Sequence, residues 1–369
     1  MKKLLKPVEP VLDKGLDTVE SFIHTHPKVN FLFGALFGAF DGLLRSSEET
    51  THTQPFIRNN YDVKRFMGAV LVALVAGWVL PAIYFYGWQS VASKLIVSFI
   101  IGIFVVDVIW AIIAREEHIS EGGFVSCLFI PAILPPQAPL WLIGLGAALA
   151  IIFRNIMGGV GNNLVNPALF SRLFLTICFP ALLVTGYQTP FVGIPDLHTF
   201  RYGLDAVTHA TPLTAFKANG EVASYLSLLL GTASGSLGET CRLALILSGL
   251  WLIKMKMKVA NWRIPASYLG SVLVFSVFFS FILGKTVAPP LFQLLSGGLI
   301  LGAFFMATDP ITATYNQTAK WIFGAGCGFV TVLIRDFTTL PEGVMYSILL
   351  MNLLAIPIQS FMVKIRYRV

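Results

Sequence analysis

Long apolar runs are the feature that most constrains what this chain can fold into. About 20 consecutive apolar residues cross the hydrocarbon core of a bilayer as a helix. Segments of this kind follow one another at residues 66–86, 94–114, 122–138, 139–157, 164–185, 226–253, 265–283, 288–306, 321–337 and 343–363. Only 12% of the 369 residues are charged, against about 25% in soluble domains. The sequence therefore predicts an all-α polytopic membrane protein with about ten transmembrane helices.

Basic residues gather where the chain would lie on the cytoplasmic side of the membrane. With the N-terminus inside, the predicted cytoplasmic segments include 254–264, KMKMKVANWRI, and the C-terminus, KIRYRV. Positive charge favours cytoplasmic loops. Residues 1–60 then form a cytoplasmic extension, 61–369 form the membrane domain, and the long loop 186–225 lies outside. The net charge of +7 is explained by these basic cytoplasmic segments, so it does not indicate that the chain binds nucleic acid.

Glycine and proline interrupt several of the predicted spans. Examples are Gly122-Gly123, Pro135-Pro136, Asn166-Pro167 and the stretch from Gly231 to Gly238. Interrupted helices at membrane depth are tolerated only against protein or a water-filled cavity, and they often mark ligand or ion sites. Five spans on each side of the long loop predict two related halves that contain broken helices.

The four cysteines stand alone in apolar stretches, with no C-x-x-C pair. Free cysteine is among the most buried residue types, so packing is the favoured interpretation. Neighbouring positions in this chain build neither a disulfide framework nor an iron–sulfur ligand set, and no metal site is expected. A cluster completed by another subunit stays open as an alternative.

Several acidic residues lie within or at the ends of predicted spans. Carboxylates at membrane depth are costly and are functional candidates by default. Acids at helix ends, however, also simply favour the positive N-terminal end of the helix dipole. For Asp107, a buried polar partner is as good an interpretation as an ion path. The candidates for an ion path are Asp107, Glu121, Glu239 and Asp309.

Two further charged residues have competing interpretations. Glu342 follows Pro341 at a predicted helix start, so capping is the favoured role. Arg172 is a candidate partner for a flavin phosphate or for one of the acids. An arginine at the edge of a span more often extends its charge to the membrane surface.

The loop at 205–211 reads Asp205-Ala-Val-Thr208-His209-Ala210-Thr211. Judged by residue types alone, these residues form a turn, because Asp and Thr side chains readily form hydrogen bonds with nearby backbone groups.

The pattern D-x-x-[ST]-x-A-T, however, resembles the flavinylation motif of the NqrB/RnfD family. In that family, the last threonine carries FMN through a phosphoester made by a separate flavin transferase. The resemblance implies covalent FMN on Thr211, with Asp205, Thr208 and Ala210 completing the motif. Members commonly have Gly where His209 stands.

Other motifs extend the resemblance from about Ile57 to the end of the chain. They are Glu121-Gly-Gly-Phe, Gly158-Gly159-Val-Gly161-Asn162-Asn163-Leu-Val-Asn166-Pro167-Ala168-Leu with Arg172, Ser236-Leu-Gly238-Glu239-Thr240 and Met306-Ala307-Thr308-Asp309-Pro310. Details of the first two are more similar to NqrB than to RnfD. Gln359 is a departure from the family pattern, because NqrB relatives often have an acidic residue at this position.

The resemblance also implies a second, noncovalent flavin, riboflavin, near Asn163 and Asn166. Amide side chains suit the edge of an isoalloxazine ring, which offers donors and acceptors without strong charge. On residue types alone, Asn166 equally caps a helix that begins at Pro167. Both interpretations can hold together.

Taken as an NqrB relative, the chain is expected to be a flavoprotein subunit of a Na⁺-translocating NADH:ubiquinone reductase in a bacterial inner membrane. Other subunits of the complex, the flavin transferase, Na⁺ and ubiquinone are its expected partners. An RnfD-type subunit of a ferredoxin:NAD⁺ oxidoreductase ion pump is the alternative. A channel or transporter without redox chemistry is a second alternative, because broken helices and duplicated halves suit it as well.

Overall fold

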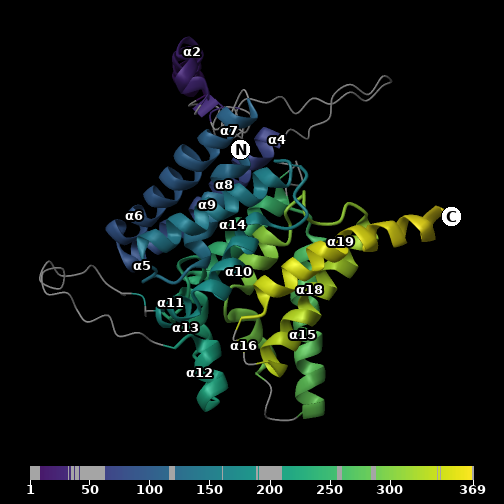
Figure 1. Cartoon of the computed structure of the whole chain (residues 1–369). Coiled ribbons are helices and arrows are strands. Elements are labelled where there is room, and N and C mark those ends of the chain that lie inside the picture. The colour runs from purple at the N-terminus through teal and green to yellow at the C-terminus, as the bar shows by residue number, and fades with distance from the viewer. Residues whose placement is uncertain are drawn as a thin grey trace, which may run out of the picture.

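The computed structural model is a helical bundle (Figure 1). It describes residues 9–31, 33–34, 37, 41, 63–115, 121–159, 161–187, 190, 210–255, 260–283, 288–338, 340 and 342–367, and none of these forms a strand. Five helices are long and apolar enough to cross a membrane: Phe66–Tyr86, Trp88–Ala114, Arg263–Ile282, Gln317–Phe337 and Val344–Arg366. The predicted fold class, an all-α polytopic membrane protein, is confirmed.

The first half of the membrane domain contains two long helices and four shorter ones. The long helices contain π-helical turns, η1 and η2, which continue their axes. The elements in chain order are α4 (Val63–Leu74), η1 (Val75–Val79), α5 (Leu80–Tyr86), α6 (Trp88–Phe99), η2 (Ile100–Asp107), α7 (Val108–Ala114), α8 (Glu121–Ile133), α9 (Leu140–Ile156), α10 (Pro167–Cys178) and α11 (Pro180–Thr185).

The second half follows the short helix α12 (Pro212–Asn219) and has three long helices. Its remaining spans are divided into short pieces. The elements in chain order are α13 (Tyr225–Leu230), η3 (Leu237–Glu239), α14 (Arg242–Lys254), α15 (Arg263–Leu283), α16 (Pro290–Leu295), α17 (Leu299–Leu301), η5 (Gly302–Met306), α18 (Gln317–Phe337) and α19 (Val344–Tyr367).

The two halves repeat one order of helix pairing. In the first half α6 and η2 pack against α9, which packs against α10; in the second, α15 packs against α18, which packs against α19. The halves meet where α14 packs on α4 and η1, α8 on η3, and α10 on α19. This repeat supports the prediction of two related halves. With five predicted spans in each half, the second half is expected to have the opposite orientation in the membrane.

Several predicted spans are not continuous helices in the structure. The span predicted at 226–253 stops at Leu230 and resumes at Arg242, and the span predicted at 288–306 is interrupted at 296–298. Gly231 explains the first break. It has a φ of +96°, and a Cβ there would overlap the carbonyl oxygen of Thr240. Only glycine fits such a left-handed position against another backbone.

Proline shortens two other predicted spans. The helix predicted at 122–138 ends at Ile133, just before Pro135 and Pro136. The span predicted at 164–185 is divided between Cys178 and Pro180, where α11 begins with proline at its first position. Proline lacks the N–H that would continue a helix, so each break follows from the chain's own residues.

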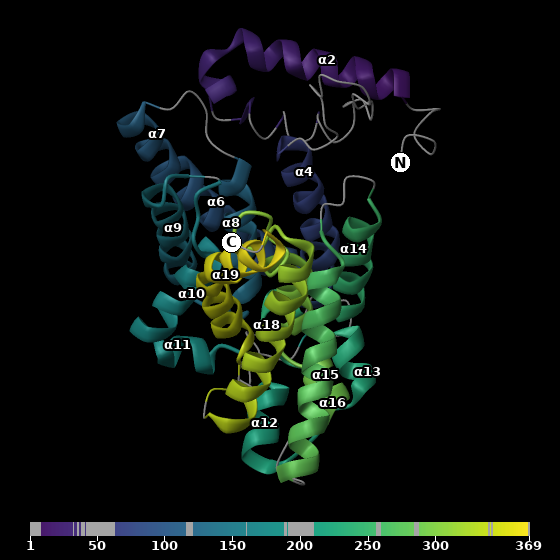
Figure 2. The same cartoon turned by 90° about the vertical axis from the view of Figure 1, so that its right-hand side faces the viewer.

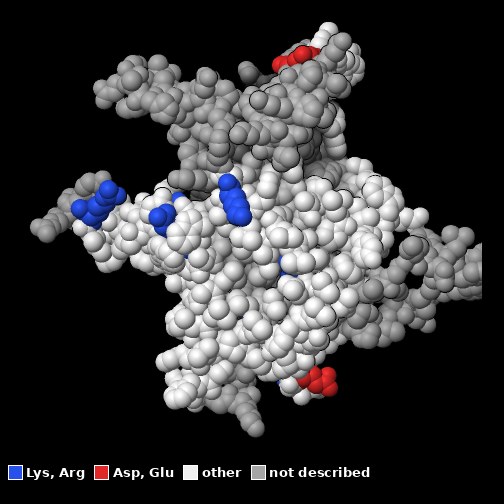
Figure 3. Space-filling view, turned by 180° about the vertical axis from the view of Figure 1, so that it is seen from behind, with Lys and Arg blue, Asp and Glu red and all other residues white. Residues whose placement is uncertain are grey.

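The outer surface of the bundle suits a hydrocarbon solvent. Large apolar side chains point outward, among them Ile113, Ile177 and Phe281, which is 91% exposed. Figure 3 shows a broad surface with few charged side chains, most of its visible Lys and Arg lying toward the upper left of the view. A soluble protein rarely exposes so much contiguous apolar surface. The chain is a multi-pass membrane protein.

The two ends of the bundle carry different elements. The amphipathic helix α2 (Glu9–Thr25) lies across one end, where α14 also ends, and the C-terminal end of α19 lies in the same half of the bundle (Figures 1 and 2). Helix α12 lies at the opposite end. This arrangement agrees with the topology predicted from loop charge. Most of 32–62 and 188–209 lies outside the described residues.

Candidate functional site

Thr211 directly precedes helix α12 and caps its N-terminus. Its side-chain oxygen accepts a hydrogen bond from the Thr214 backbone N–H at 3.3 Å, and the two threonine hydroxyls lie 2.8 Å apart. Thr211 is 8% exposed, whereas its neighbour Ala210 is exposed. Asp205 and Thr208, the other predicted motif residues, lie outside the described residues, as does His209.

Helix α12 is held at both ends, through Ala210 just before Thr211 and through Lys217 in its last turn. Ser234 donates to the carbonyl of Ala210 at 2.7 Å, and Lys217 donates to the carbonyls of Thr338 and Leu340 at 2.7 and 2.5 Å. Burial lowers the pKa of Lys217, although Asp336 nearby acts in the other direction. A small apolar cluster beneath the helix contains Leu213, Leu228, Ala288 and Phe292. Thr211 therefore lies on a fixed element, although it follows a long loop.

The asparagines predicted to bind riboflavin have different environments. Asn166 caps α10, because its Oδ1 accepts from the N–H groups of Ala168 and Leu169 at 3.1 and 3.4 Å. The capping interpretation is therefore confirmed for Asn166. Asn163 is buried, and its Oδ1 has no hydrogen-bond partner. Asn163 is thus the asparagine whose side chain has a free acceptor.

Asn163 borders two cavities at the end of the bundle opposite α12. The smaller, of about 60 Å³, reaches Arg154, Asn166 and Asp309. The larger, of about 490 Å³, lies between the loops at 161–164 and 311–315 and helix α19. Ligand sites commonly measure about 300–1,000 Å³. Only the larger cavity reaches the size of a cofactor ring.

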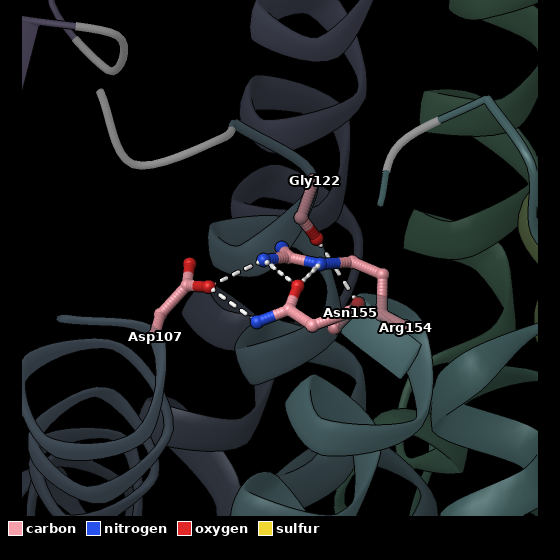
Figure 4. Close-up of polar contacts among 5 residues, drawn as sticks. Asp107, Gly122, Arg154 and Asn155 are labelled. Carbon is pink, nitrogen blue, oxygen red and sulfur yellow. Dashed lines mark hydrogen bonds and ion pairs between the residues drawn. The ribbon is translucent and has the colours of Figure 1, made fainter. Parts of the chain in front are cut away.

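Asp107 has a buried partner that the sequence analysis missed. Its Oδ1 accepts from Arg154 Nη2 at 2.6 Å and from Asn155 Nδ2 at 3.0 Å, next to Gly122 at the start of α8 (Figure 4). Asp107 Oδ2 and Arg154 Nη1 remain without partners. A Cβ on Gly123 would lie 2.7 Å from Arg154 Nη1, so glycine makes room for the pair. Of the two interpretations of Asp107, the buried polar partner is present.

The second half contains a similar buried arginine at the end of its fourth span. Arg335 donates from Nη1 to the carbonyl of Gln293 at 2.6 Å and from Nη2 to that of Ser296 at 3.0 Å. The Gln293 amide donates to Asp336 at 2.8 Å. The sequence signal was present: Arg-Asn ends one apolar run at 154–155 and Arg-Asp ends its counterpart at 335–336.

Arg172 forms an ion pair with Glu342, a contact between α10 and the residues just before α19. The Tyr187 hydroxyl lies 3.4 Å from the same carboxylate. Glu342 was expected to cap the helix that follows it, but its carboxylate instead forms an ion pair with Arg172. Arg172 was predicted to contact a flavin phosphate, but its ionic partner in the structure is this carboxylate.

Glu239 lies where two broken spans approach each other. The residue is 4% exposed, and its Oε2 and Oε1 would lie 3.2 and 3.1 Å from a Cβ on Gly235 and on Gly298. Both glycines belong to interruptions, one between α13 and η3 and the other between α16 and α17. The structure therefore places this carboxylate in the kind of setting that interrupted helices create at ion sites.

The other two acidic candidates have less distinctive settings. Asp309 accepts from the Ile311 N–H at 3.2 Å and from the Thr312 hydroxyl at 3.3 Å. Burial raises the pKa of Asp309, and these hydrogen bonds oppose the shift. Glu121 begins α8, but its side chain lies outside the described residues.

Metal chemistry receives no support from the described part of the chain. The residues in it form no group of three or more His, Cys, Asp or Glu that could hold a metal ion. All four cysteines are free; Cys127 and Cys327 are buried, as expected for packing residues, whereas Cys178 is exposed.

Fold and site together define a class: a multi-pass helical membrane protein whose spans break around buried ionisable groups. Residues 50–368 match the NQR2, RnfD, RnfE family. The chain belongs to that family, and the predicted resemblance is confirmed at this level.

Two relatives show where in the family the similarity lies. The chain is 33% identical over 331 residues to the D component of the proton-translocating ferredoxin:NAD(+) oxidoreductase complex of Clostridium ljungdahlii, covering 86% of this chain and 96% of that protein. It is 30% identical over 334 residues to the D component of the ion-translocating oxidoreductase complex of Escherichia coli, covering 82% and 93%. Both relatives belong to complexes of this ion-translocating type, so these matches do not support the specific assignment to NqrB.

Proposed function

We propose that this chain is the RnfD-type, flavin-bearing subunit of an ion-translocating oxidoreductase complex in a bacterial inner membrane. The family match and the two relatives, each the D component of its complex, support this proposal over the NqrB interpretation. Its partners would be the other subunits of the complex and the flavin transferase. The predicted use of Na⁺ and ubiquinone stays a prediction, because it depends on the NqrB assignment.

The observation that carries the proposal is the position of the Thr211 hydroxyl at the N-terminus of α12. The first N–H groups of a helix lack intrahelical partners, and the helix dipole favours negative charge there. A phosphoester on Thr211 would place its anion at this end. The residues present therefore fit covalent FMN. A flavin held there would supply one- and two-electron transfer, which no amino-acid side chain here provides.

The remaining residues would hold α12 and provide the route for the ion. Lys217 fixes α12 on the loop before α19. We further propose Glu239 as the ion-path residue that the structure favours most, because its carboxylate lies between two interruptions. A noncovalent flavin beside Asn163 completes the proposal.

Mass spectrometry of the peptide that contains Thr211 tests the central claim. We expect an FMN-sized adduct on the wild-type peptide and none in Thr211→Ala. Thr214→Ala is the matched control, because it removes the neighbouring hydroxyl but leaves the acceptor, and it should keep the adduct. An unmodified wild-type peptide, or covalent flavin that persists in Thr211→Ala, would contradict the proposal.

Enzyme assays of the purified complex then separate the two redox interpretations. An RnfD-type complex should couple ferredoxin to NAD⁺, whereas an NqrB-type complex should reduce ubiquinone with NADH. A solute channel or transporter would carry no flavin, so the adduct also excludes that alternative.

A further inference from the structure

Helix α12, which begins just after Thr211, contacts the chain that joins α18 to α19. Lys217, in the last turn of α12, donates to the carbonyls of Thr338 and Leu340 at 2.7 and 2.5 Å. These carbonyls lie 121 and 123 positions further along the chain. The helix proposed to carry FMN is therefore joined through Lys217 to the residues that precede α19.

The same residues are held firmly against α18. The Thr338 hydroxyl donates to the carbonyl of Ile334 at 2.7 Å and accepts from the Leu340 N–H at 3.2 Å. A Cβ on Gly343 would lie 2.6 Å from the carbonyl oxygen of Thr331, so glycine permits this close approach. A displacement of the two carbonyls would therefore reach the start of α19 instead of being absorbed on the way.

Glu342, two positions after Leu340, takes part in the ion pair between the two halves. Its partner, Arg172, lies on α10 in the first half. Glu239 interacts electrostatically with both members of the pair, because the Glu342 carboxylate repels it and the Arg172 guanidinium attracts it. One arginine from the first half thus lies between two carboxylates of the second.

A further arginine near Glu239 belongs to the second half itself. Arg242 donates from Nη1 to the carbonyl of Leu228, on α13, at 2.6 Å. A shift of one half against the other would therefore leave Arg242 in place beside Glu239. The same shift would change how far Arg172 lies from Glu239. Arg172 is accordingly the cation whose distance to Glu239 depends on the contact between the halves.

We propose that Lys217 is a positioning residue that couples α12 to the ion site at Glu239. A change of charge at Thr211 acts on α12, because the helix dipole begins there. Through Lys217, the position of α12 sets the position of Glu342, and with it whether Arg172 pairs with Glu342 or with Glu239.

Charge balance then links this choice of partner to ion release. A buried carboxylate needs a compensating positive charge. While Arg172 is held by Glu342, a proton or Na⁺ supplies that charge at Glu239. When Arg172 pairs with Glu239, the guanidinium replaces the cation, which leaves. This inference rests on the proposed function, because it takes Glu239 as the residue that binds the ion.

Hydrogen exchange of the purified complex, followed by mass spectrometry, tests the link from α12. The peptide that contains Leu340 is compared between protein oxidised in air and protein reduced with dithionite. We expect its exchange to differ between the two states in the wild type and in Lys217→Arg, which keeps a cationic donor. The difference should vanish in Lys217→Met and in Thr211→Ala. Equal exchange in both states of the wild type, or a difference that persists in Lys217→Met, would overturn the inference.

The number of ions moved per electron, measured in reconstituted vesicles, gives a second test. Lys217→Met should lower this ratio by about fivefold or more, while FMN on Thr211 is retained and electron transfer continues. Lys217→Arg should keep the ratio near the wild-type value. Asn219→Ala, an exposed change on the same helix, is the matched control and should leave the ratio unchanged. A wild-type ratio in Lys217→Met would overturn the inference.

A double variant shows whether Lys217 and Glu342 act through one route. If they do, Lys217→Met combined with Glu342→Gln should be no less coupled than the more severe single variant. Losses that multiply would mean independent effects and would overturn the inference. FMN on Thr211 together with normal coupling in Lys217→Met would overturn this inference alone. A wild-type Thr211 without FMN would contradict the proposed function as well.

Discussion

Asp107 and Arg154 show how costly a buried ion pair is to disturb. Their side chains lie in a nearly dry site and are joined by Asn155. Removing one partner leaves an uncompensated charge in a low-dielectric surrounding, whereas replacing both with apolar residues is often nearly neutral. We therefore expect the pair to favour one specific fold over alternatives more than it raises the free energy of unfolding.

We predict that Asp107→Leu lowers the free energy of unfolding by about 3 kcal/mol. The double variant Asp107→Leu with Arg154→Met should recover most of that loss. Thermal unfolding of the detergent-solubilised protein measures both. If the double variant were as unstable as the single one, the packing around Asn155, and not the unpaired charge, would be the cause.

At the scale of elements, continuous helices could be predicted from the sequence more closely than broken ones. The span predicted at 66–86 matches the helix Phe66–Tyr86, and 321–337 lies within Gln317–Phe337. Apolar run length is a local property, so it can be found by inspection. The interruption at Gly231 depends on how closely the chain returns to Thr240, which is a tertiary property.

The same reasoning explains the missed site residues. Asp107 and Arg154 are 47 positions apart, and their meeting depends on the packing of η2 against α9. By contrast, the cap made by Asn166 depends only on its immediate neighbours, and it could be predicted. The larger cavity beside Asn163 combines three segments, and no local pattern marks it.

We predict that Gly231→Ala lowers the free energy of unfolding by about 3 kcal/mol or prevents folding. The added methyl would meet the carbonyl of Thr240, and φ would remain in the left-handed region. Gly270→Ala is the matched control. No atom lies within 4 Å of its Cβ position inside α15, so it should stabilise by up to about 1 kcal/mol. Thermal melts of the two variants give the comparison.

Across the whole molecule, two sets of ionisable groups lie where the two halves meet. Arg172 on α10 pairs with Glu342 before α19, and Glu239 lies near the interface of α8 and η3. A protein that moves an ion between two halves would need groups that both halves can reach. The arrangement thus suits the proposed pump better than a purely structural membrane protein.

We predict that Glu239→Gln separates ion transport from cofactor content. In the reconstituted complex, ion uptake per electron should fall to a small fraction of the wild-type value, because the amide cannot exchange a charge. FMN on Thr211 should be unchanged. A pH-sensitive dye and a radioactive sodium assay distinguish proton from Na⁺ movement. Undiminished transport of both ions would remove Glu239 from the path.

The interrupted spans have a consequence for how the protein is made. A helix that stops partway through a bilayer leaves backbone N–H and carbonyl groups that lipid cannot satisfy. Helix α8 packs against η3, and α10 packs against α19. Both partners are synthesised much later than α8 and α10. We therefore expect the early part of the chain to reach its final packing only after the last helix has been synthesised. A truncation before α19 should for this reason be degraded rather than accumulate as a stable half.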